Sequence, residues 1–306
     1  MLFVSFAQNF EDLTLYRALR DIPHGFYIDV GAFHAEHFSV TKAFYDRGWS
    51  GVNIEPNPRL LHEISRARTR DINLCTAIAD TPGSVRLTIF ENEAFSTTTA
   101  ETVTNHGEGH HVREVVTVPA ITLNSVWSEH VKPGGDVHFL KLDIEGGERD
   151  VIRSFDWNQY RPWIVVVEST RPSTDIDSSY EWEDTILNAN YSLAYNDRLN
   201  RFYVAAEHED LVARLALPPS VHDGFILAEQ ASLRARVAEL EEVNESLLDS
   251  IADLQQSIDE RWHELDAASA RYAALTASYS WRITRPLRAM SRTVRGWFRR
   301  SDSAES

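Results

Sequence analysis

The sequence predicts an α/β fold in which a doubly wound, mostly parallel sheet is followed by a C-terminal helical coiled coil. Three observations support this prediction. Short apolar runs alternate with amphipathic stretches over residues 26–206, heptads begin at residue 229, and arginines gather after residue 279. Because each pattern belongs to a different kind of structure, we expect three parts, residues 1–228, 229–279 and 280–306.

Five apolar runs predict strands buried on both faces of a sheet. They are "FYIDV", "GVNIE", "NLCTAIA", "VHFLKLDI" and "WIVVVES". Helical patterns separate most of them, which is the βαβ rhythm of a parallel sheet. The later stretch "YSLAYNDRLNRFYVAA" predicts two strands joined by a short turn, so the sheet should end in an antiparallel pair.

Between the third and fourth strands, the sequence predicts a hairpin-like insertion. It consists of "SVRLTIFE", a polar loop at residues 92–114 and "VVTVPAITL". We expect the tip of this insertion to be mobile, and loops of this kind often cover binding sites.

Composition is that of a soluble protein with a sizeable core, since 43% of the 306 residues are hydrophobic. No run approaches the 18 apolar residues of a spanning helix, and the first residues lack the features of a signal peptide, so a cytoplasmic location is expected. Cys75 is the only cysteine, which excludes an intramolecular disulfide and a cysteine-rich zinc site. Its apolar neighbours predict a buried thiol.

Charge is distributed unevenly along the chain. The net charge is -16, but residues 280–306 hold seven arginines against Asp302 and Glu305, which leaves +5 there and -21 for residues 1–279. The body is therefore acidic and the end basic, a balance that disfavours nucleic acid as the partner of the body.

Residues 229–279 show coiled-coil spacing. One seam position holds Val237, Asn244, Ile251, Ile258, Leu265 and Tyr272, and the other holds Leu233, Leu240, Leu247, Leu254, Arg261, Ala268 and Leu275. Branched residues at a, leucines at d and a single Asn at a favour a parallel homodimer. The alternative is a helix packed on its own domain, because Arg261 and Ala268 weaken the second half of the seam and Leu248 and Trp262 fall outside it.

In residues 280–306, arginines recur three or four positions apart and apolar or aromatic residues lie between them. If helical, this segment suits the anionic inner face of a membrane. A nucleic-acid tail is less favoured because of the aromatic content, and a disordered solubilising end is a further alternative.

The stretch "FYIDVGAFHAEH" places an acid at a strand end, followed by a glycine turn and a probable helix, at the sheet edge where doubly wound folds bind ligands. A dinucleotide fingerprint needs three glycines, and only Gly31 is present, which disfavours NAD and FAD. The chain also lacks the GxxxxGK[ST] pattern of a P-loop.

S-adenosylmethionine fits this turn better, since it has a ribose and an adenine but no phosphate. Its sulfonium cation favours an acidic pocket, and Asp29, Glu55 and Asp80 follow three consecutive strands. Glu55 lies near the distance at which an acid holds ribose hydroxyls, and Asp80 falls where the adenine edge would lie. For each acid taken alone, a helix cap or turn role is the alternative.

Several segments together resemble the FkbM family of S-adenosylmethionine-dependent methyltransferases. They are "FAQNFEDLTLYRAL", "FYIDVGAFHAEHFSVTKAFYDRGWSGVNIEPNP", "VHFLKLDIEGGERDVI", "IVVVEST" and "LNRFYV", within residues 5–225. The resemblance implies a seven-stranded methyltransferase fold, methyl transfer to a hydroxyl of a sugar or natural product, and cofactor contacts at the turn from Asp29 through Gly31 to Ala32 and at Glu55. Asn57, two residues later, is a further candidate. "SYSWRITRPLR" separately resembles a segment at the ends of bacterial enzymes that build surface glycans.

Transfer to a hydroxyl needs a base or a metal, because the acceptor is hardly ionised at neutral pH. "KLDIEGGE" ends the fourth strand, and alternation should place Lys141, Asp143 and Glu145 on one side. Asp143 is the first candidate for base or metal ligand. Lys141 ranks second because nearby carboxylates raise the pKa of its amine. Glu148 fits either a catalytic role or a role in the first turn of the next helix.

Glu168, which ends the fifth strand, is expected to join Asp143 if a divalent ion binds. Gln8, Glu11 and Asp12 belong to the opening motif of the family and are expected on a helix that closes over the methionine end of the cofactor. The alternative for these three is a solvated helix face.

Histidines occur at two places of interest. His34 and His37 follow the cofactor turn and are candidates for acceptor contacts, with a plain loop role as the alternative. The segment "HGEGHH" with His106, His110 and His111 suggests a metal site, but a loop without a strand or helix does not fix ligand geometry.

Two functions follow from these patterns. The first is an O-methyltransferase for a glycan or glycolipid sugar, dimerised by its coil. The second is an inactive methyltransferase-like scaffold that recruits glycan-assembly enzymes, against which the presence of Asp29, Gly31, Glu55 and Asp143 argues. Nitrogen as the attacked atom stays open.

Overall fold

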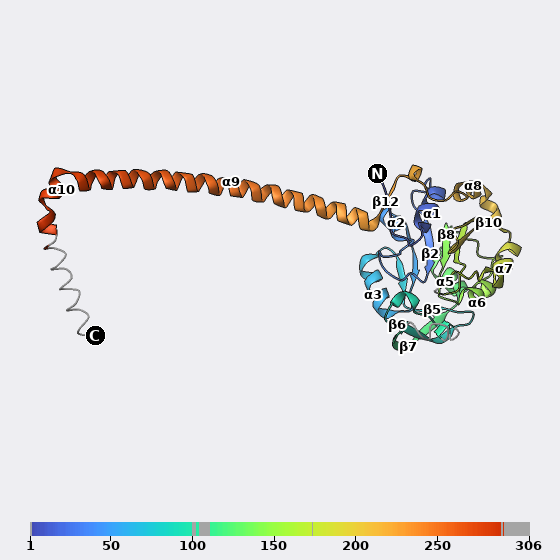
Figure 1. Ribbon diagram of the computed structural model, residues 1–306. Coiled ribbons are helices and arrows are strands. Elements are labelled where there is room, and N and C mark those ends of the chain that lie inside the picture. Colours follow the sequence, from blue (N-terminus) through green and yellow to red (C-terminus); the bar gives the residue numbers. More distant parts are fainter. Residues whose placement is uncertain (1, 100–101, 104–110, 173, 289, 291–306) are drawn as a thin grey trace, which may run out of the picture. The chain divides into compact units, whose positions relative to one another are not determined.

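The computed structural model describes residues 2–99, 102–103, 111–172, 174–288 and 290. The chain divides into two compact units, Met1–Ala231 and Ser232–Ser306. The elements are numbered in chain order, and Figure 1 labels many of them. The expected mobile tip of the insertion falls largely on residues 100–101 and 104–110, which lie outside the described residues.

The first unit contains the predicted seven-stranded sheet, in the order β10-β11-β9-β8-β2-β3-β4. Its strands are β2 (Phe26–Val30), β3 (Ser50–Ile54), β4 (Ile72–Leu74), β8 (Phe139–Leu142), β9 (Ile164–Glu168), β10 (Tyr191–Asn196) and β11 (Asn200–Ala205). The strands from β9 to β4 are parallel, and β11 runs antiparallel to both β9 and β10. The mostly parallel sheet and its antiparallel final pair are therefore confirmed.

The chain runs outward from β2 through β3 to β4 and then returns to place β8 on the other side of β2. This reversal makes the carboxyl ends of the neighbouring strands β2 and β8 a switch point, because the connections that follow the two strands leave in opposite directions. Doubly wound folds bind their ligands at such a switch point.

Helices cover both faces of the sheet. The helices of this unit include α1 (Glu11–Leu19), α2 (Lys42–Asp46), α3 (Pro58–Ala67), α5 (Leu123–His130), α6 (Glu148–Ser154), α7 (Glu183–Asn188) and α8 (Val212–Leu215), with short 3-10 turns η1 (Glu93–Phe95), η2 (Ser179–Glu181), η3 (Ala206–Leu211) and η4 (Val221–Asp223). Side chains of α5, α6 and α7 belong to the apolar core on one face, and those of α1, α2 and α8 belong to the core on the other.

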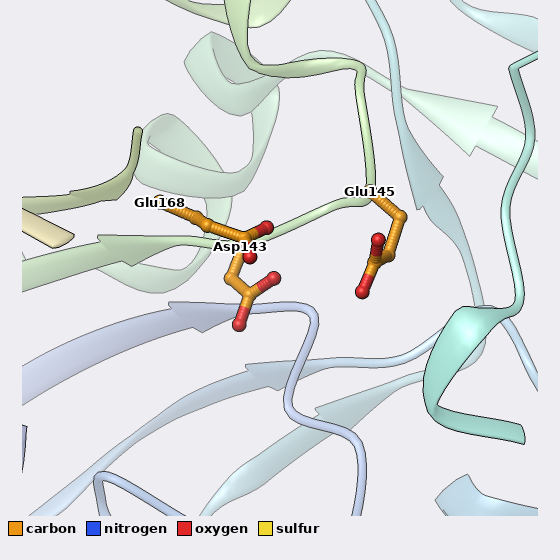
Figure 2. A group of neighbouring side chains, drawn as sticks. All are labelled: Asp143, Glu145 and Glu168. Carbon is orange, nitrogen blue, oxygen red and sulfur yellow. The ribbon is translucent and has the colours of Figure 1, made fainter. Parts of the chain in front are cut away.

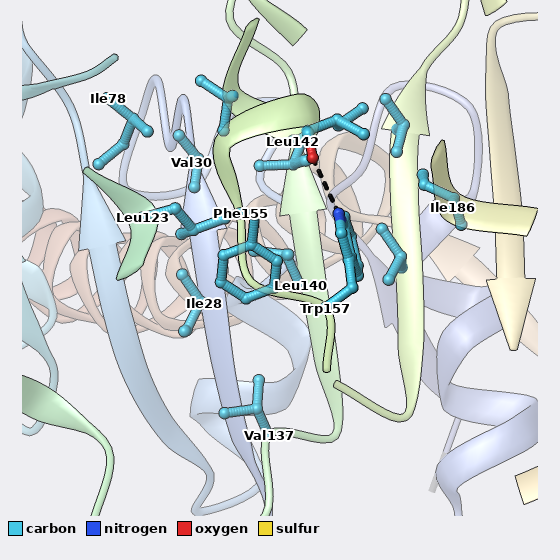
Figure 3. Packing of buried hydrophobic residues seen from close by; sticks show 14 of the residues in the cluster. Ile28, Val30, Ile78, Leu123, Val137, Leu140, Leu142, Phe155, Trp157 and Ile186 are labelled. Carbon is cyan, nitrogen blue, oxygen red and sulfur yellow. Dashed lines mark hydrogen bonds between the residues drawn. The ribbon is translucent and has the colours of Figure 1, made fainter. Parts of the chain in front are cut away.

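Strand alternation builds these two cores from the same strands. Ile28 and Leu140 face the α5–α6 side, where Figure 3 shows them with Phe155 and Trp157. Tyr27, which precedes Ile28, belongs to the opposite core. Burying each aliphatic side chain contributes about 1.5–3 kcal/mol, so the double-sided apolar runs hold the sheet between its helices.

Figure 3 also shows how the packing keeps polar atoms satisfied. The Trp157 indole Nε1 donates a hydrogen bond of 2.8 Å to the carbonyl oxygen of Ile152, so the buried ring leaves no unpaired donor. This bond also fixes the end of α6 against the segment that leads into β9.

The predicted insertion is a separate three-stranded sheet in the order β5-β7-β6. Its strands are β5 (Ala77–Ile78), β6 (Gly83–Phe90) and β7 (Val112–Ile121), and β6 pairs antiparallel with β7. The hairpin is confirmed, and β7 also pairs in parallel with β5.

Two predictions about "NLCTAIA" were wrong. This run is two strands, because β4 ends at Leu74 in the central sheet and β5 begins at Ala77 in the insertion sheet. Cys75 lies where the chain crosses from one sheet to the other, and it is exposed rather than buried. The apolar residues around it belong to two different packing surfaces, which a single sequence run does not reveal.

A two-stranded parallel pair of β1 (Phe3–Ser5) and β12 (Phe225–Leu227) joins the beginning and the end of the first unit. The predicted long C-terminal helix is confirmed as α9 (Ala228–Ala277), and α10 (Tyr279–Ile283) follows it. Among the described residues, no helix has both the length and the apolar character needed to cross a bilayer.

Candidate active site

A cavity of about 880 Å³ opens at the carboxyl edge of the central sheet. Val30 at the end of β2, Gly31 after it, Glu55 after β3 and Asp143 after β8 contribute to its wall. The insertion adds residues 92–96 and Thr98 to the wall, as expected for a loop that covers a site. The volume is in the range of small-molecule sites, and its place at the switch point is where this topology binds ligands.

Gly31 forms the tight turn that follows β2. Its φ is +78°, and a Cβ built there would lie 1.8 Å from the carbonyl oxygen of Asp143. Its backbone N–H donates to the carbonyl oxygen of Ile54 at 3.0 Å. Only glycine satisfies both the left-handed conformation and this close approach, so the turn brings the ends of β2, β3 and β8 together at the cavity.

Asp29 lies beneath this turn and does not line the cavity. It is 1% exposed, and its Oδ2 accepts a hydrogen bond of 3.0 Å from the hydroxyl of Thr41. Its Oδ1 accepts no hydrogen bond among the described residues and lies 3.4 Å from Nζ of Lys141. Asp29 therefore acts as a buried counter-charge that supports the turn from below. Ala32 is also buried and outside the cavity wall.

Glu55 faces the cavity from the end of β3. Its Oε2 accepts from the backbone N–H of Phe33 at 3.0 Å, and its Oε1 accepts from that of Asn57 at 2.8 Å. Burial raises the pKa of this carboxyl to about 7, although the two backbone donors oppose the shift. Each oxygen keeps a lone pair for a further donor, which is what binding a pair of ribose hydroxyls requires.

Lys141 is held in the middle of the site. Its Nζ donates to the carbonyl oxygen of Gly31 at 2.8 Å and lies 3.4 Å from Oδ1 of Asp29 and 3.3 Å from Oδ2 of Asp143. Burial lowers the pKa of the amine, but the two carboxylates outweigh burial and raise it above its ordinary value. Lys141 is therefore a fixed cation at neutral pH, so the arrangement argues against its use as a base.

Three carboxylates meet beside Lys141. Asp143, Glu145 and Glu168 each offer an oxygen within 4.8 Å of the others, and Figure 2 shows them directed toward a common space. Burial and the charge of Asp143 raise the pKa of Glu145 to about 9. The same two causes raise the pKa of Glu168 well above its ordinary value. Such a cluster either shares protons or holds a cation, since three adjacent negative charges repel one another.

Glu145 joins the cluster from a turn after β8, whereas strand alternation predicted that it would continue the strand. β8 ends at Leu142, and Glu145 occupies a turn in which its own φ is +53° and that of Gly146 is +102°. Glu148 holds this turn, since its carboxylate accepts from the backbone N–H of Ile144 at 2.9 Å and of Gly146 at 3.1 Å. Glu148 does not line the main cavity, so its position fits a supporting role at the start of α6.

The amino-terminal segment contributes two of its three candidates to the cavity. Gln8 and Glu11 line it, and Oε1 of Glu11 accepts from the amide of Asn200 at 2.8 Å. Asp12 is fully buried away from the cavity, where Oδ1 accepts from the Ser5 hydroxyl at 2.7 Å and from the Leu13 backbone N–H at 2.7 Å. Asp12 thus fastens the start of α1.

Most of the other predicted residues lie outside the cavity wall. Asn57 caps α3 by accepting from the N–H of Arg59. His34 bonds within its own turn and lies 3.2 Å from Glu63, whereas His37 lines the cavity. Asp80 is exposed and outside the cavity wall. The wall contributed by α3 and the insertion sheet is instead apolar, with Leu60, Ala77, Ile78 and Leu87.

In the "HGEGHH" segment, His106 and His110 lie outside the described residues. His111 is exposed just before β7. The structure therefore does not test the suggested histidine metal site.

Several wall residues escaped the sequence analysis. They are Phe33, Phe38, Asn92, Ser96, Thr98, Thr170, Thr174, Asp175 and Asn200. Their residue types are common in any loop. Only their shared position at the carboxyl edge of the central sheet distinguishes them. The available signal was position, since each lies near the end of a predicted strand or in the predicted covering loop.

A doubly wound sheet with an acid-lined cavity at its switch point, and without a phosphate-binding loop, is typical of α/β enzymes that use a nucleoside-type cofactor. The methyltransferase FkbM domain family matches residues 29–193, which is more than half of the chain. The chain therefore belongs to the FkbM methyltransferase family and is an S-adenosylmethionine-dependent methyltransferase. No curated protein and no solved structure matches it.

The residues present fit S-adenosylmethionine. Glu55 offers paired acceptors for ribose hydroxyls, and the apolar wall beside it suits an adenine ring. The carboxyl groups of Asp143, Glu145 and Glu168, at the ends of β8 and β9, provide oxygen atoms that suit a sulfonium. The matched segment begins at Asp29 and includes Gly31, Glu55 and the acid cluster, but it ends before α9.

Proposed function

We propose that the protein transfers a methyl group to a hydroxyl of a sugar in a glycan, glycolipid or related natural product. The observation that carries this proposal is the cluster of Asp143, Glu145 and Glu168 on the wall of the cofactor cavity. A hydroxyl acceptor must lose a proton, and Asp143 can receive it, or the three residues together can hold an ion that promotes its release. Family membership favours this enzyme over an inactive scaffold.

Asp143 is the preferred proton acceptor. S-adenosylmethionine supplies an electrophilic methyl group, and the chain must supply the group that takes up the acceptor proton. The Asp143 side chain is 35% exposed and lines the cavity, so a hydroxyl can reach it. Lys141, as a fixed cation 3.3 Å away, orients this carboxylate.

Polar side chains around the rest of the cavity support a polyhydroxylated acceptor. Asn92, Ser96 and Thr98 come from the insertion, and Thr170 and Asp175 follow β9. Together they offer donors and acceptors to a ligand in the cavity that Asp143 also lines. Such a lining suits the alternating hydroxyls of a sugar better than a flat apolar acceptor.

We further propose that the same cluster binds a divalent cation such as Mg²⁺. Asp143, Glu145 and Glu168 would hold it, since hard cations prefer carboxylate oxygens, and it would lower the pKa of a bound hydroxyl. We expect EDTA to abolish turnover and Mg²⁺ to restore it. Binding of Mn²⁺, followed by electron paramagnetic resonance, should be weakened by Glu168→Gln. An unchanged Mn²⁺ signal would contradict the proposal that this cluster binds a divalent ion.

Residues 279–288 support a further proposal, contact with an anionic membrane surface. Ile283 and Leu287 are exposed among arginines, and the Arg288 guanidinium lies 3.8 Å from the centre of the Trp281 ring. Co-sedimentation with vesicles containing anionic lipid, compared with neutral vesicles, tests this contact. Equal recovery with both vesicles would argue against it.

The decisive experiment follows a labelled methyl group. We expect transfer from S-adenosylmethionine to an extracted glycan, and a fall of about 100-fold or more with Asp143→Ala, the scale of a lost general base. Asp150→Ala removes an exposed acid from α6 and should leave the rate unchanged.

Isothermal titration should first show that the protein and both variants bind S-adenosylmethionine. A wild-type protein that binds the cofactor but labels no hydroxyl, or an Asp143→Ala variant as fast as wild type, would overturn the proposed mechanism.

A further inference from the structure

The helix α9 carries an apolar stripe that no described residue of its own unit covers. It runs for 50 residues without a break, and over its whole range, all of which is described, it has no buried residue. Leu240, Ile251 and Leu254 are 50%, 49% and 64% exposed. At 1.5 Å per residue the helix is about 75 Å long, and an isolated helix with an exposed apolar seam is marginal in water.

We propose that this stripe is an interface between two copies of the chain, which form a parallel, in-register, two-stranded coiled coil. The a positions hold branched residues at Val237, Ile251 and Ile258, and leucines occupy four successive d positions from Leu233 to Leu254. This division between a and d favours two strands over three or four. The occupant is therefore a second α9.

Asn244 sets the direction and the register. In a parallel pair each a residue meets the same residue of the partner, so the two Asn244 amides can bond to each other across the seam. In an antiparallel pair a residues meet d residues, and Asn244 would face an apolar side chain without a polar partner. Because an unpaired buried amide is costly, only the parallel register satisfies it.

The positions that flank the seam are complementary in the same register. In a parallel coil a g residue lies beside the e residue five positions later on the other helix. Glu229 then meets the partner's Arg234, and Arg236 meets the partner's Glu241. Next along the helix, Val243 meets the partner's Leu248, so Leu248, outside the a and d seam, widens the apolar contact.

These flanking pairs need little rearrangement. Within one helix Arg236 pairs with Glu239 at 2.6 Å, but both side chains are about 60% exposed. An exposed pair of this kind contributes little, so Arg236 can turn toward the partner's Glu241 at small cost. No like charges meet in the three g-to-e pairs between residues 229 and 248.

The coil should be strongest in its first half. Arg261 and Ala268 occupy d positions after residue 258, where one places a charge in the seam and the other leaves it underfilled. We expect the pair to separate first at this end, and the contacts before residue 258 to determine whether the dimer persists.

Mass measurement tests the dimer. Light scattering of the full-length protein should give about twice the 34.9 kDa of one chain. Ile251→Lys places a charge at an a position and should shift the mass to that of one chain. Gln256→Lys adds the same side chain five residues later, on the outer f position, and should remain dimeric.

Cross-linking tests direction and register. In a Cys75→Ser background, which removes the exposed native thiol, Leu240→Cys should form an intermolecular disulfide on mild oxidation. Gln256→Cys, on the outer face of the coil, should not. An antiparallel pair would place the two introduced thiols far apart along the helix, so it would leave the Leu240→Cys protein uncross-linked.

A monomeric wild-type protein, a trimer, or a dimer unaffected by Ile251→Lys would overturn this proposal. None of these results depends on the methyl acceptor, since binding of S-adenosylmethionine is measured separately. The Ile251→Lys protein should keep that binding, which shows that its catalytic unit is folded and that only the coil has been disrupted.

Discussion

At the scale of single residues, the site depends on how closely the backbone of one strand end approaches that of another. The absence of a side chain at Gly31 lets the carbonyl oxygen of Asp143 lie against the turn. The carbonyl oxygen of Gly31 in turn accepts from Lys141, which pairs with Asp143. One backbone position therefore fixes both the cofactor turn and the proposed proton acceptor.

Gly31→Ala should accordingly damage stability and binding together. The added Cβ would meet a carbonyl oxygen at 1.8 Å in a left-handed conformation, so we expect a loss of about 2–4 kcal/mol in the free energy of unfolding and loss of S-adenosylmethionine binding. Urea denaturation and titration calorimetry measure the two effects. Gly83→Ala is the control, since no heavy atom lies within 4 Å of its Cβ, and it should change stability by less than about 1 kcal/mol.

Glu55 should make cofactor binding depend on pH. Burial raises the pKa of its carboxyl to about 7, so the group is mostly protonated at pH 6 and mostly ionised at pH 8. The ionised form accepts two hydroxyl hydrogen bonds, and binding that requires it should strengthen by about tenfold over this range.

Calorimetric titrations with S-adenosylhomocysteine, which lacks the sulfonium charge, isolate this effect of Glu55 on the ribose. Glu55→Gln should bind weakly at both pH values and abolish the difference. An affinity that falls between pH 6 and pH 8 would contradict the assignment.

At the scale of elements, a buried arginine ties α3 to the segment that follows the cofactor turn. Arg68, which caps the end of α3, is 1% exposed, and its guanidinium donates to the carbonyl oxygen of Ala35 and to the Ser39 hydroxyl, each at 2.8 Å. Its charge is balanced by Asp71 at 3.7 Å. The loop between β2 and α2 is thereby held beside the cavity.

Arg68→Met should release this loop. Removing one partner of a buried ion pair leaves the other uncompensated, so we expect a loss of about 3 kcal/mol in the free energy of unfolding. S-adenosylmethionine should also bind more weakly, because Phe33 and His37 of this loop line the cavity. Arg66→Met changes an exposed arginine of α3 and should alter neither quantity. Equal denaturation midpoints for the two variants would show that Arg68 does not hold this loop in place.

At the scale of the whole molecule, buried acids around the cavity link folding to pH. Burial is the main cause of the raised pKa of each, to about 7 for Glu11, Glu55 and Glu148 and to about 9 for Glu145. A carboxyl with a raised pKa in the folded state binds its proton more tightly there than in the unfolded chain. Its contribution to stability is complete below its ordinary pKa and is lost as the pH rises through the folded value.

The ligand-free protein in EDTA should therefore lose stability between pH 7 and pH 9. Glu145 alone should account for about 2 kcal/mol, because it keeps its proton in the folded state over most of this interval. The lowered pKa values of His138 and His208 act in the opposite direction, but their effect is largely complete by pH 7. Urea unfolding at each pH measures the free energy of unfolding, and its change with pH gives the slope.

Glu145→Gln should flatten this slope, whereas Glu114→Gln, at an exposed position in β7, should leave it unchanged. Stability that increases from pH 7 to pH 9 would show that the acids are not held in their protonated forms.

The sequence by itself determined the class of fold and the place of the site. Apolar runs separated by amphipathic helices allow few arrangements other than a helix-covered parallel sheet, and Gly31 after a strand marks the ligand edge. Glu55, Lys141 and Asp143 were identified because they end strands, and the ends of parallel strands meet. The long helix followed from its heptads, since a repeated seam is a local pattern.

Only the tertiary structure decided which polar residues face the ligand and which support the chain. Asp29 and Asp12 are both acids next to strands or helices, yet both are buried in internal hydrogen bonds, whereas Glu145 reaches the cavity through a left-handed turn. Cys75 is exposed despite its apolar neighbours in the sequence, for the same reason. Burial depends on which surfaces pack together, and that information resides in contacts between segments far apart in the sequence.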